Sequence, residues 1–226
     1  MASAWQWILA SASPRRRQLL EQLGLEFTVY PSDVDETSPE FVDLPPAQLV
    51  ERLALAKASA VARRYAHQTD PSASPRPLVI GADTVVVLED EILGKPVDAD
   101  HARRMLNQLA GRMHTVYTGI ALIDVAAGRT AVTHRATRVW LRPLPASWID
   151  AYVATGEPLD KAGAYAVQGL GAAFVERIEG CYFNVVGLPL AALVELLEAW
   201  GIQLPLLWPA HIPRAERGAS SPLRQG

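Results

Sequence analysis

The sequence feature that most constrains this fold is a long hydrophobic run from Leu78 to Leu88 that carries Asp83 and Thr84 at its centre. Its branched aliphatic residues predict a long β-strand. A carboxylate in such a run is costly to bury without a partner. Asp83 is therefore expected to be paired with a cation, bound to a metal or catalytic, with a structural acid at a strand end as the alternative.

Around this strand, helices and strands alternate in the first half of the chain. The apolar segment from Trp5 to Ala10 predicts a first strand, and Ser13 and Pro14 are typical of the N-cap and first residue of a helix that ends at Gly24. Further strands are expected at 27–30, 92–93, 115–125 and 131–141, and on both sides of Glu179 and Gly180. Further helices are expected from Pro45, at 98–109, at 147–154 and at 189–200, with loops at 31–44, 67–77 and 156–171. Hairpins dominate the second half, which favours an α/β fold with a mixed sheet over a purely parallel one.

The length of the chain, 226 residues, suits one sizeable domain or two small lobes that share a cleft. Half of the residues are hydrophobic, so the chain can bury a substantial core. We expect a single α/β domain over residues 1–202. From Gln203 onward Pro, Arg, Ser and Gly dominate, and residues 203–226 are expected to form a flexible tail.

Charge and cysteine content exclude several classes of site and partner. The formal net charge is −3, so the chain as a whole has no attraction for nucleic acid or an acidic membrane. Cys181 is the single cysteine, which excludes an internal disulfide and a cysteine-based zinc site. The five histidines lack the spacing of paired metal ligands. A lone cysteine fits a reducing compartment, and we expect a cytoplasmic protein.

The N-terminal segment is similar in composition to a targeting signal, but it lacks the length and the preceding positive charge that such a signal requires. No run in the sequence approaches the length of a membrane span. The apolar stretch from Trp5 to Ala10 is too short for a signal peptide, and no Lys or Arg precedes it. A transit peptide is the other alternative for this Ser- and Arg-rich start, and a buried first strand explains the same residues better.

The first candidate site is the segment Ser11-Ala12-Ser13-Pro14-Arg15-Arg16-Arg17, between the first strand and the first helix. A helix N-terminus presents free N–H groups and a partial positive charge. Serine hydroxyls and guanidinium groups at that position make a cradle for phosphate, and arginine can bind two phosphate oxygens at once. The alternative is a capped helix with solvated arginines.

Two later segments add cations and a possible base-reading group. Lys95 follows the predicted hairpin, in a Gly-Lys-Pro sequence that does not match a Walker loop. In the glycine-rich stretch 160–171, Lys161 could neutralise phosphate, and Gln168 offers both a donor and an acceptor to a base edge. The alternatives are a solvated lysine and a glycine-rich surface loop.

Two more charged residues could reach the same place. Lys57 lies one position from the apolar stripe of the long helix, where it could point inward at an anion, although a lysine there more often extends to solvent. Glu36 is one of several acids in the loop 31–44, and it could help Asp83 to chelate a metal.

Taken in this order, these segments resemble the Maf-like nucleoside triphosphate pyrophosphatase family, also called septum-formation inhibitor proteins, from about Trp7 to Gly201. The resemblance implies the Maf/ITPase-like fold, an elongated mixed sheet flanked by helices, with two lobes around a nucleotide cleft. It implies that Asp83 is catalytic and that Asp83 and Glu36 hold a divalent metal cation, Mg²⁺ or Mn²⁺. The substrate-binding residues that it implies are Ser11, Ser13, Arg15, Arg16, Lys57, Thr84, Lys95, Lys161 and Gln168.

The resemblance also extends to a subgroup. Ala-Asp-Thr at 82–84 and Val-Gln-Gly at 167–169 resemble the branch that acts on dTTP and UTP. Arg15, Thr84 and Gln168 therefore look like the specificity positions. The reaction implied is metal-dependent hydrolysis of a nucleoside triphosphate to the monophosphate and pyrophosphate, by a homodimer whose partner is a small nucleotide rather than a nucleic acid or a membrane.

Two alternatives of other kinds stay open at this point. One is a nucleotide-sensing regulator of cell division and septum formation with little catalysis, in which the same residues would only hold a ligand. The other is a pyrophosphatase for modified nucleotides such as 7-methyl-GTP, because specificity rests here on few positions.

Overall fold

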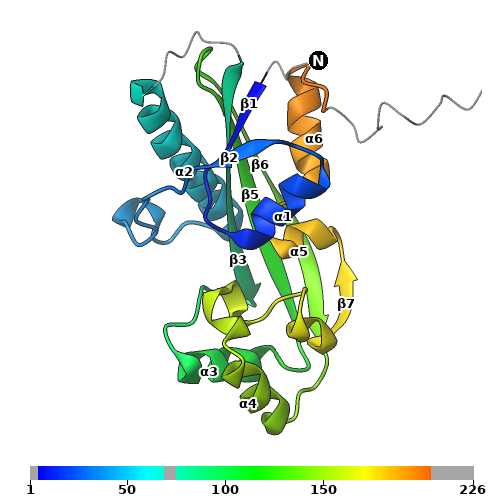
Figure 1. The fold of residues 1–226 in the computed structure, drawn as a ribbon. Helices are drawn as coiled ribbons and strands as arrows, with labels where there is room; N and C mark the ends of the chain where they lie inside the picture. Colours follow the sequence, from blue (N-terminus) through cyan, green and yellow to red (C-terminus); the bar gives the residue numbers. More distant parts are fainter. Residues whose placement is uncertain (1–4, 69–74, 205–226) are drawn as a thin grey trace, which may run out of the picture.

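A computed structural model describes residues 5–68 and 75–204. At its centre is a seven-stranded sheet in the order β2-β1-β3-β5-β6-β7, with β4 also paired to β3 (Figure 1). Strand β1 is parallel to β2 and β3, and the other pairs are antiparallel, which confirms the mixed sheet. The strands are β1 (Trp5–Leu9), β2 (Phe27–Val29), β3 (Arg76–Leu88), β4 (Glu91–Leu93), β5 (Met113–Asp124), β6 (Arg129–Leu141) and β7 (Val175–Glu179).

Helices flank this sheet, as expected. In Figure 1, α2 lies along one face of the long strands, α1 and α6 lie on the opposite side, and α3 and α4 lie near one end of the strands. The helices are α1 (Pro14–Gln22), α2 (Pro46–Gln68), α3 (Ala99–Leu109), α4 (Ala146–Ala154), α5 (Tyr182–Val186) and α6 (Leu190–Ala199). None of the helices in the described part of the chain has the length and apolar character needed to cross a membrane.

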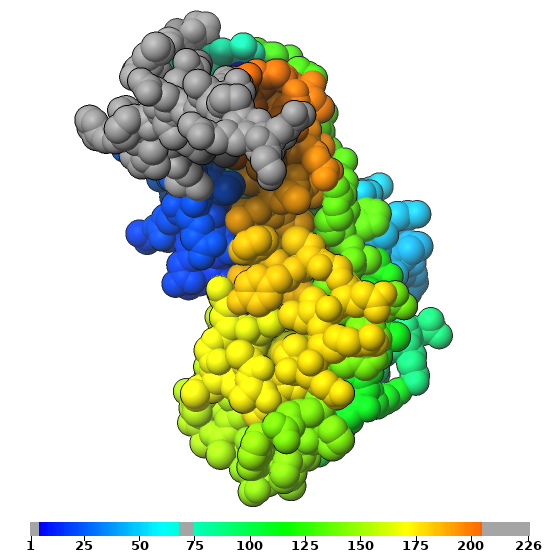
Figure 2. Space-filling view, turned by 90° about the vertical axis from the view of Figure 1, so that its right-hand side faces the viewer, coloured from blue at the N-terminus to red at the C-terminus, as the bar shows by residue number. Residues whose placement is uncertain are grey.

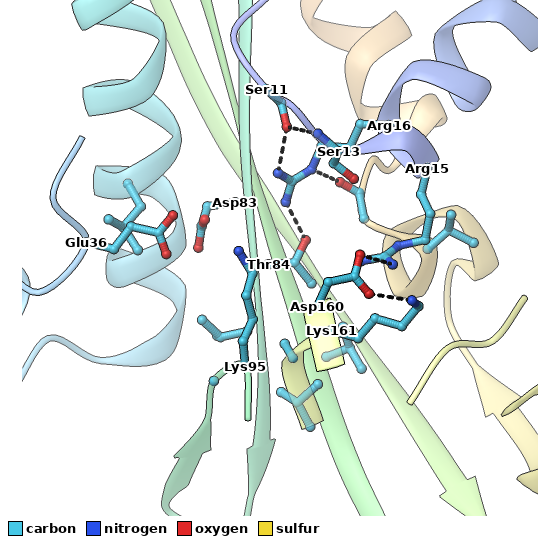
Figure 3. Close-up of a pocket in the computed structure, with 18 of the residues that line it drawn as sticks. Ser11, Ser13, Arg15, Arg16, Glu36, Asp83, Thr84, Lys95, Asp160 and Lys161 are labelled. Carbon is cyan, nitrogen blue, oxygen red and sulfur yellow. Dashed lines mark hydrogen bonds and ion pairs between the residues drawn. The ribbon is translucent and has the colours of Figure 1, made fainter. Parts of the chain in front are cut away.

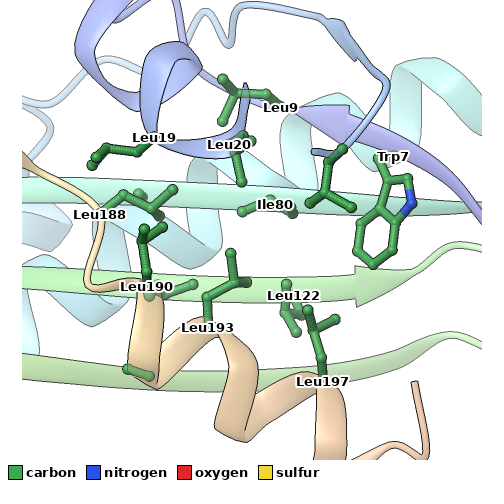
Figure 4. Close-up of a cluster of buried hydrophobic side chains, with 14 of the residues drawn as sticks. Trp7, Leu9, Leu19, Leu20, Ile80, Leu122, Leu188, Leu190, Leu193 and Leu197 are labelled. Carbon is green, nitrogen blue, oxygen red and sulfur yellow. The ribbon is translucent and has the colours of Figure 1, made fainter. Parts of the chain in front are cut away.

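Strand β3 is buried on both faces, and its side chains alternate between them. Leu78 and Ile80 pack with residues of β1, α1 and α6 in the cluster shown in Figure 4. Val79 and Val85 pack instead in clusters that include residues of α2. This period of two places Asp83 on the side of α2 and the next residue on the opposite side.

Two glycines allow α2 to lie unusually close to the sheet. A Cβ atom built on Gly81 of β3 would lie 2.3 Å from the Ala54 carbonyl oxygen, and one built on Gly119 of β5 would lie 2.2 Å from the Val50 carbonyl oxygen. Both distances are well below van der Waals contact, so no larger residue fits without moving the helix. The absence of side chains at these two positions therefore fixes the depth at which α2 sits.

Two sequence predictions about local structure were wrong or incomplete. A strand was expected after Gly180, but α5 follows instead, because the buried Asn184 side chain binds the carbonyl oxygen of Val116 and the hydroxyl of Thr137. The glycine-rich stretch expected as a loop contains short 3-10 turns at Glu157–Asp160, Ala162–Ala164 and Leu170–Phe174, and the acidic loop contains another at Pro39–Phe41.

One expected loop was too long at both ends, and two further expectations stay predictions. The loop expected at 67–77 is shorter, because α2 continues to Gln68 and β3 begins at Arg76, and residues 69–74 lie outside the described part. The expected tail lies outside it from residue 205 onward. The single domain over residues 1–202 and its two lobes stay predictions.

The packing of α2 yields a stability prediction. Gly119→Ala should lower the free energy of unfolding by about 3 kcal/mol, because the added methyl group would overlap the backbone of α2 and force it outward. Gly94→Ala is the matched control, since a Cβ atom there would meet nothing within 4 Å. Urea unfolding of both variants measures the difference, and equal stability of the two would contradict the close approach.

Candidate active site

One cavity of about 600 Å³ is lined by residues from distant parts of the chain (Figure 3). Its volume is in the range of sites for small organic ligands. Among the residues that line it are all those singled out from the sequence: Ser11, Ser13, Arg15, Arg16, Glu36, Lys57, Asp83, Thr84, Lys95, Lys161 and Gln168. The fold therefore brings together every candidate residue.

The cavity lies where one edge of β3 has a gap in its pairing. Strand β1 pairs with β3 up to Ile80, and β4 begins to pair with it at Val86. The opposite edge of β3 is continuously paired to β5 through this stretch, so β1 and β4 occupy the same edge. Asp83 and Thr84 lie in the interval between them, where side chains from both faces of the strand can reach one space.

Three charged groups meet on the α2 side of this gap. The Lys57 ammonium lies 2.5 Å from a carboxylate oxygen of Asp83 and 2.6 Å from one of Glu36. Lys57 and Asp83 are 8% and 5% exposed. Lys57 therefore points inward, the less common of the two placements considered for it, and Asp83 has the paired cation that was one of its three possible roles. The close approach of α2 to β3 makes this contact possible.

Burial gives the two carboxyl groups different affinities for a proton. Burial raises the pKa of Asp83 above its usual value, although Lys57 and Arg16 pull it down. Burial acts the same way on Glu36, but there the charge of Lys57 prevails and the pKa is lowered. Asp83 is thus the more basic of the two carboxylates.

Arg16 lies on the other side of β3 and is held by neutral oxygens. Its Nε donates to the Gly187 carbonyl oxygen at 2.8 Å, and its two terminal nitrogens donate to the hydroxyls of Ser11 at 3.2 Å and Thr84 at 3.0 Å. Burial lowers its pKa. None of the ion pairs found in the described residues involves Arg16, so a half-buried positive charge faces the cavity without a direct counterion in that part of the chain. Such a charge favours an anionic ligand.

The helix start that carries Arg16 differs in one detail from the sequence prediction. Ser13 is the N-cap of α1 and Pro14 its first residue, as expected, but the Ser13 side chain makes no capping hydrogen bond. Instead, the Ser13 N–H donates to the hydroxyl of Ser11 at 3.2 Å. Both serines therefore shape the turn that leads into the helix.

Arg15 and Lys161, unlike Arg16, both lie near one acidic residue, to which the sequence analysis assigned no role. A carboxylate oxygen of Asp160 lies 2.6 Å from the Lys161 ammonium, and the other lies 3.8 Å from the Arg15 guanidinium (Figure 3). Lys161 also donates to the Glu157 carbonyl oxygen at 2.6 Å. The only sequence signal was that Asp160 directly precedes Lys161.

Glu157 was also missed, and it holds the segment that carries Gln168. Its carboxylate accepts hydrogen bonds from the backbone N–H groups of Leu170 and Gly171, both at 3.1 Å, and from the Tyr152 hydroxyl at 2.9 Å. Burial raises the pKa of Glu157, but these donors outweigh it and lower the pKa. A glycine-rich segment tied down in this way can present a side chain in a defined orientation, which a free loop cannot do.

A buried pair anchors the same region to β5. His114 Nε2 lies 2.7 Å from the hydroxyl of Tyr165, which lines the cavity. Burial lowers the pKa of His114 to about 4, so it is neutral at physiological pH and adds no charge to the site.

Comparison with known proteins points to one family. The family model for "Maf-like protein" matches residues 6–200. A protein of Moorella thermoacetica called dTTP/UTP pyrophosphatase is 56% identical over 197 residues, which cover 87% of this chain and 96% of that protein. Proteins of the same name from Pelotomaculum thermopropionicum and Gloeobacter violaceus are 54% and 55% identical, over 86% and 84% of this chain and 96% and 93% of their own lengths.

The raised pKa of Asp83 yields a prediction about stability. An acid whose pKa is higher in the folded state than in the unfolded state makes the protein less stable as pH rises through the folded-state value. Asp83→Asn removes this cost, and Lys57 keeps its contact with Glu36. We therefore expect the variant to be at least as stable as the wild type at pH 7.

Chemical denaturation from about pH 8 to about pH 4 measures this difference. The wild type should gain stability relative to Asp83→Asn as pH falls below the folded-state pKa of Asp83. Asp90→Asn, at an exposed turn away from the cavity, is the control substitution. A variant that is less stable at pH 7 by a margin independent of pH would contradict the assignment.

Proposed function

The chain belongs to the Maf-like protein family, and from that premise we propose that it hydrolyses nucleoside triphosphates, dTTP and UTP above all, to the monophosphate and pyrophosphate. The relatives' shared name, dTTP/UTP pyrophosphatase, supports the reaction and the substrates. The observation that carries the proposal is the position of Asp83, a buried carboxylate of raised pKa at the edge of a cavity rich in cations.

The cations of the cavity suit a triphosphate. Arg15, Arg16, Lys95 and Lys161 line it together with Lys57. Phosphoryl chemistry depends mainly on positioning and on stabilising negative charge, so this set of side chains supplies what the reaction needs most. Arg16, which has no direct acidic partner among the described residues, is the group best prepared to receive phosphate oxygens.

A divalent metal fits the two acids of the site. Asp83 and Glu36 offer hard carboxylate oxygens on either side of one cationic group, Lys57. The described residues contain no cluster of three or more candidate ligands, and one or two carboxylates completed by substrate phosphates are typical of Mg²⁺. We propose that Asp83 and Glu36 hold Mg²⁺ or Mn²⁺, which supplies neutralising charge to the triphosphate when bound.

Asp83 is the proposed general base. Its raised pKa makes it a stronger base than an exposed aspartate. It would take a proton from a water molecule that attacks the α-phosphorus. The bond between the α-phosphorus and its bridging oxygen would break, and that oxygen would leave with pyrophosphate. Lys57 would hold the Asp83 side chain in place, and Arg16 would bind phosphate oxygens.

Base selection is proposed for the side of the cavity that holds Gln168. Its amide can donate and accept at once, as the edge of a pyrimidine requires. Glu157 fixes the backbone that follows Gln168, which restricts the directions available to the amide. Thr84 and Arg15 are the other proposed specificity positions.

We also propose a cytoplasmic location and a homodimer. The location rests on the single cysteine, Cys181, which is free and suits a reducing compartment. The dimer rests on the family resemblance alone, and light scattering of the purified protein tests it.

The test of function is a product assay on a panel of nucleoside triphosphates that includes 7-methyl-GTP. The wild type with Mg²⁺ or Mn²⁺ should release pyrophosphate, not orthophosphate, from dTTP and UTP. Asp83→Asn should lose at least ~100-fold in turnover, because it keeps the shape of the side chain but not its basicity. Asp90→Asn should behave as the wild type.

Each other outcome has a definite meaning. Release of orthophosphate would place the attack on the γ-phosphorus and overturn the proposed reaction. A preference for 7-methyl-GTP would overturn the proposed base selection. Bound nucleotide without turnover would favour a sensing protein.

A further inference from the structure

A chain of three hydrogen bonds leads from Arg16 into the interior of the sheet. Arg16 donates to the Thr84 hydroxyl at 3.0 Å, which lies 2.9 Å from the Thr118 hydroxyl. Thr118 in turn donates to the Asn184 carbonyl oxygen at 2.8 Å. Thr118 and Asn184 are both 0% exposed, and neither is among the residues that line the cavity.

The donor and the acceptor in each bond of this hydrogen-bond chain follow from the number of protons that each group can donate. A hydroxyl has one proton to donate, and that of Thr118 goes to a carbonyl oxygen, which can only accept. Thr84 must therefore donate to Thr118, and its own oxygen is left to accept from Arg16. All three bonds point away from the cavity, and one arrangement of protons satisfies them all. Bonds aligned in this way strengthen one another.

Asn184 fixes the far end of the chain. Its amide nitrogen donates to the Val116 carbonyl oxygen at 2.9 Å and to the Thr137 hydroxyl at 3.0 Å, which ties α5 to β5 and β6. Its amide oxygen is buried and has no hydrogen-bond partner among the described residues. The two bonds of its amide nitrogen therefore fix the position of α5 against the sheet.

Helix α5 also provides a second acceptor for Arg16. The residue after the helix is Gly187, and its carbonyl oxygen accepts from Arg16 Nε at 2.8 Å. In Figure 2 the segment that includes α5 lies directly beside α1, although the two are far apart in the sequence. The anchored α5 therefore controls two of the three acceptors of Arg16, one directly and one through Thr118 and Thr84.

We propose that Thr118 and Asn184 are positioning residues for Arg16, which keep its guanidinium aimed at the β- and γ-phosphates of the substrate and at the pyrophosphate product. This proposal rests on the proposed function, because it gives Arg16 a phosphate ligand. It also bears on Thr84. The Thr84 proton is committed to Thr118, so Thr84 acts here through Arg16, and it can contribute to base selection only as an acceptor or by its shape.

The experiment compares three variants of the full chain. Thr118→Val keeps the shape of the side chain and breaks the hydrogen-bond chain, Thr118→Ser restores the hydroxyl, and Tyr65→Phe removes a hydrogen bond to Gln6, away from the cavity. Titration calorimetry with inorganic pyrophosphate and Mg²⁺ measures affinity, dTTP hydrolysis gives KM and kcat, and thermal unfolding reports the structural cost.

Thr118→Val should weaken pyrophosphate binding and raise KM for dTTP, each about tenfold, as expected for one lost hydrogen bond in a charged network. Thr118→Ser should recover both to within about threefold. Tyr65→Phe should lower the melting temperature without changing either constant. Wild-type affinity in Thr118→Val, or no recovery in Thr118→Ser, would overturn the positioning role.

The two proposals can fail separately. If the wild type binds pyrophosphate but does not hydrolyse dTTP, the proposed function fails, and the calorimetric series still decides whether Thr118 positions Arg16. If the wild type does not bind pyrophosphate either, the positioning proposal is overturned as well.

Discussion

The close packing of α2 against β3 and β5 is the constraint on which the rest of the site depends. It requires glycine at positions 81 and 119, because a Cβ atom at either would overlap the helix backbone. It carries Lys57 to Asp83, and without that cation the ionised carboxylate would be buried with no partner on its own side of the strand. The distance between α2 and the sheet thus decides whether Asp83 can be buried in its ionised form.

The alternation of side chains along β3 divides the chemistry of the site in two. Asp83 faces α2 with Lys57 and Glu36, where the proposed proton transfer and metal binding belong. The next residue, Thr84, faces the opposite side and meets Arg16, where phosphate is proposed to bind. A single bound molecule can reach both sides only because the pairing of β3 is interrupted between β1 and β4. The edge gap therefore joins two half-sites that the sheet would otherwise separate.

Much of this could be predicted from the sequence, and the remainder has no local signal. The hydrophobic run around Asp83 predicted a strand, and it gave a charged partner as one of three explanations for the acid; both the strand and the partner are present. The helix at 182–186 was mistaken for a strand because its residues are apolar and aromatic, while the contacts that favour the helix come from β5 and β6. In the sequence, Thr118 is likewise an ordinary strand residue. Only the folded structure shows that it lies between Thr84 and Asn184. Long-range hydrogen bonds of this kind leave no spacing pattern to recognise.

Arg16 is held in a different way from Arg15 and Lys161, and the difference bears on turnover in the proposed reaction. Arg16 is fixed by three neutral oxygens and forms no ion pair within the described residues, so an incoming phosphate need not displace a carboxylate of that part of the chain to reach it. Arg15 and Lys161 are already near Asp160, and a phosphate must compete with that carboxylate for them. In the proposed reaction, Arg16 would then supply most of the fixed binding. The pair held by Asp160 would bind pyrophosphate less tightly than two unpaired cations, because the carboxylate can take them back as the product leaves.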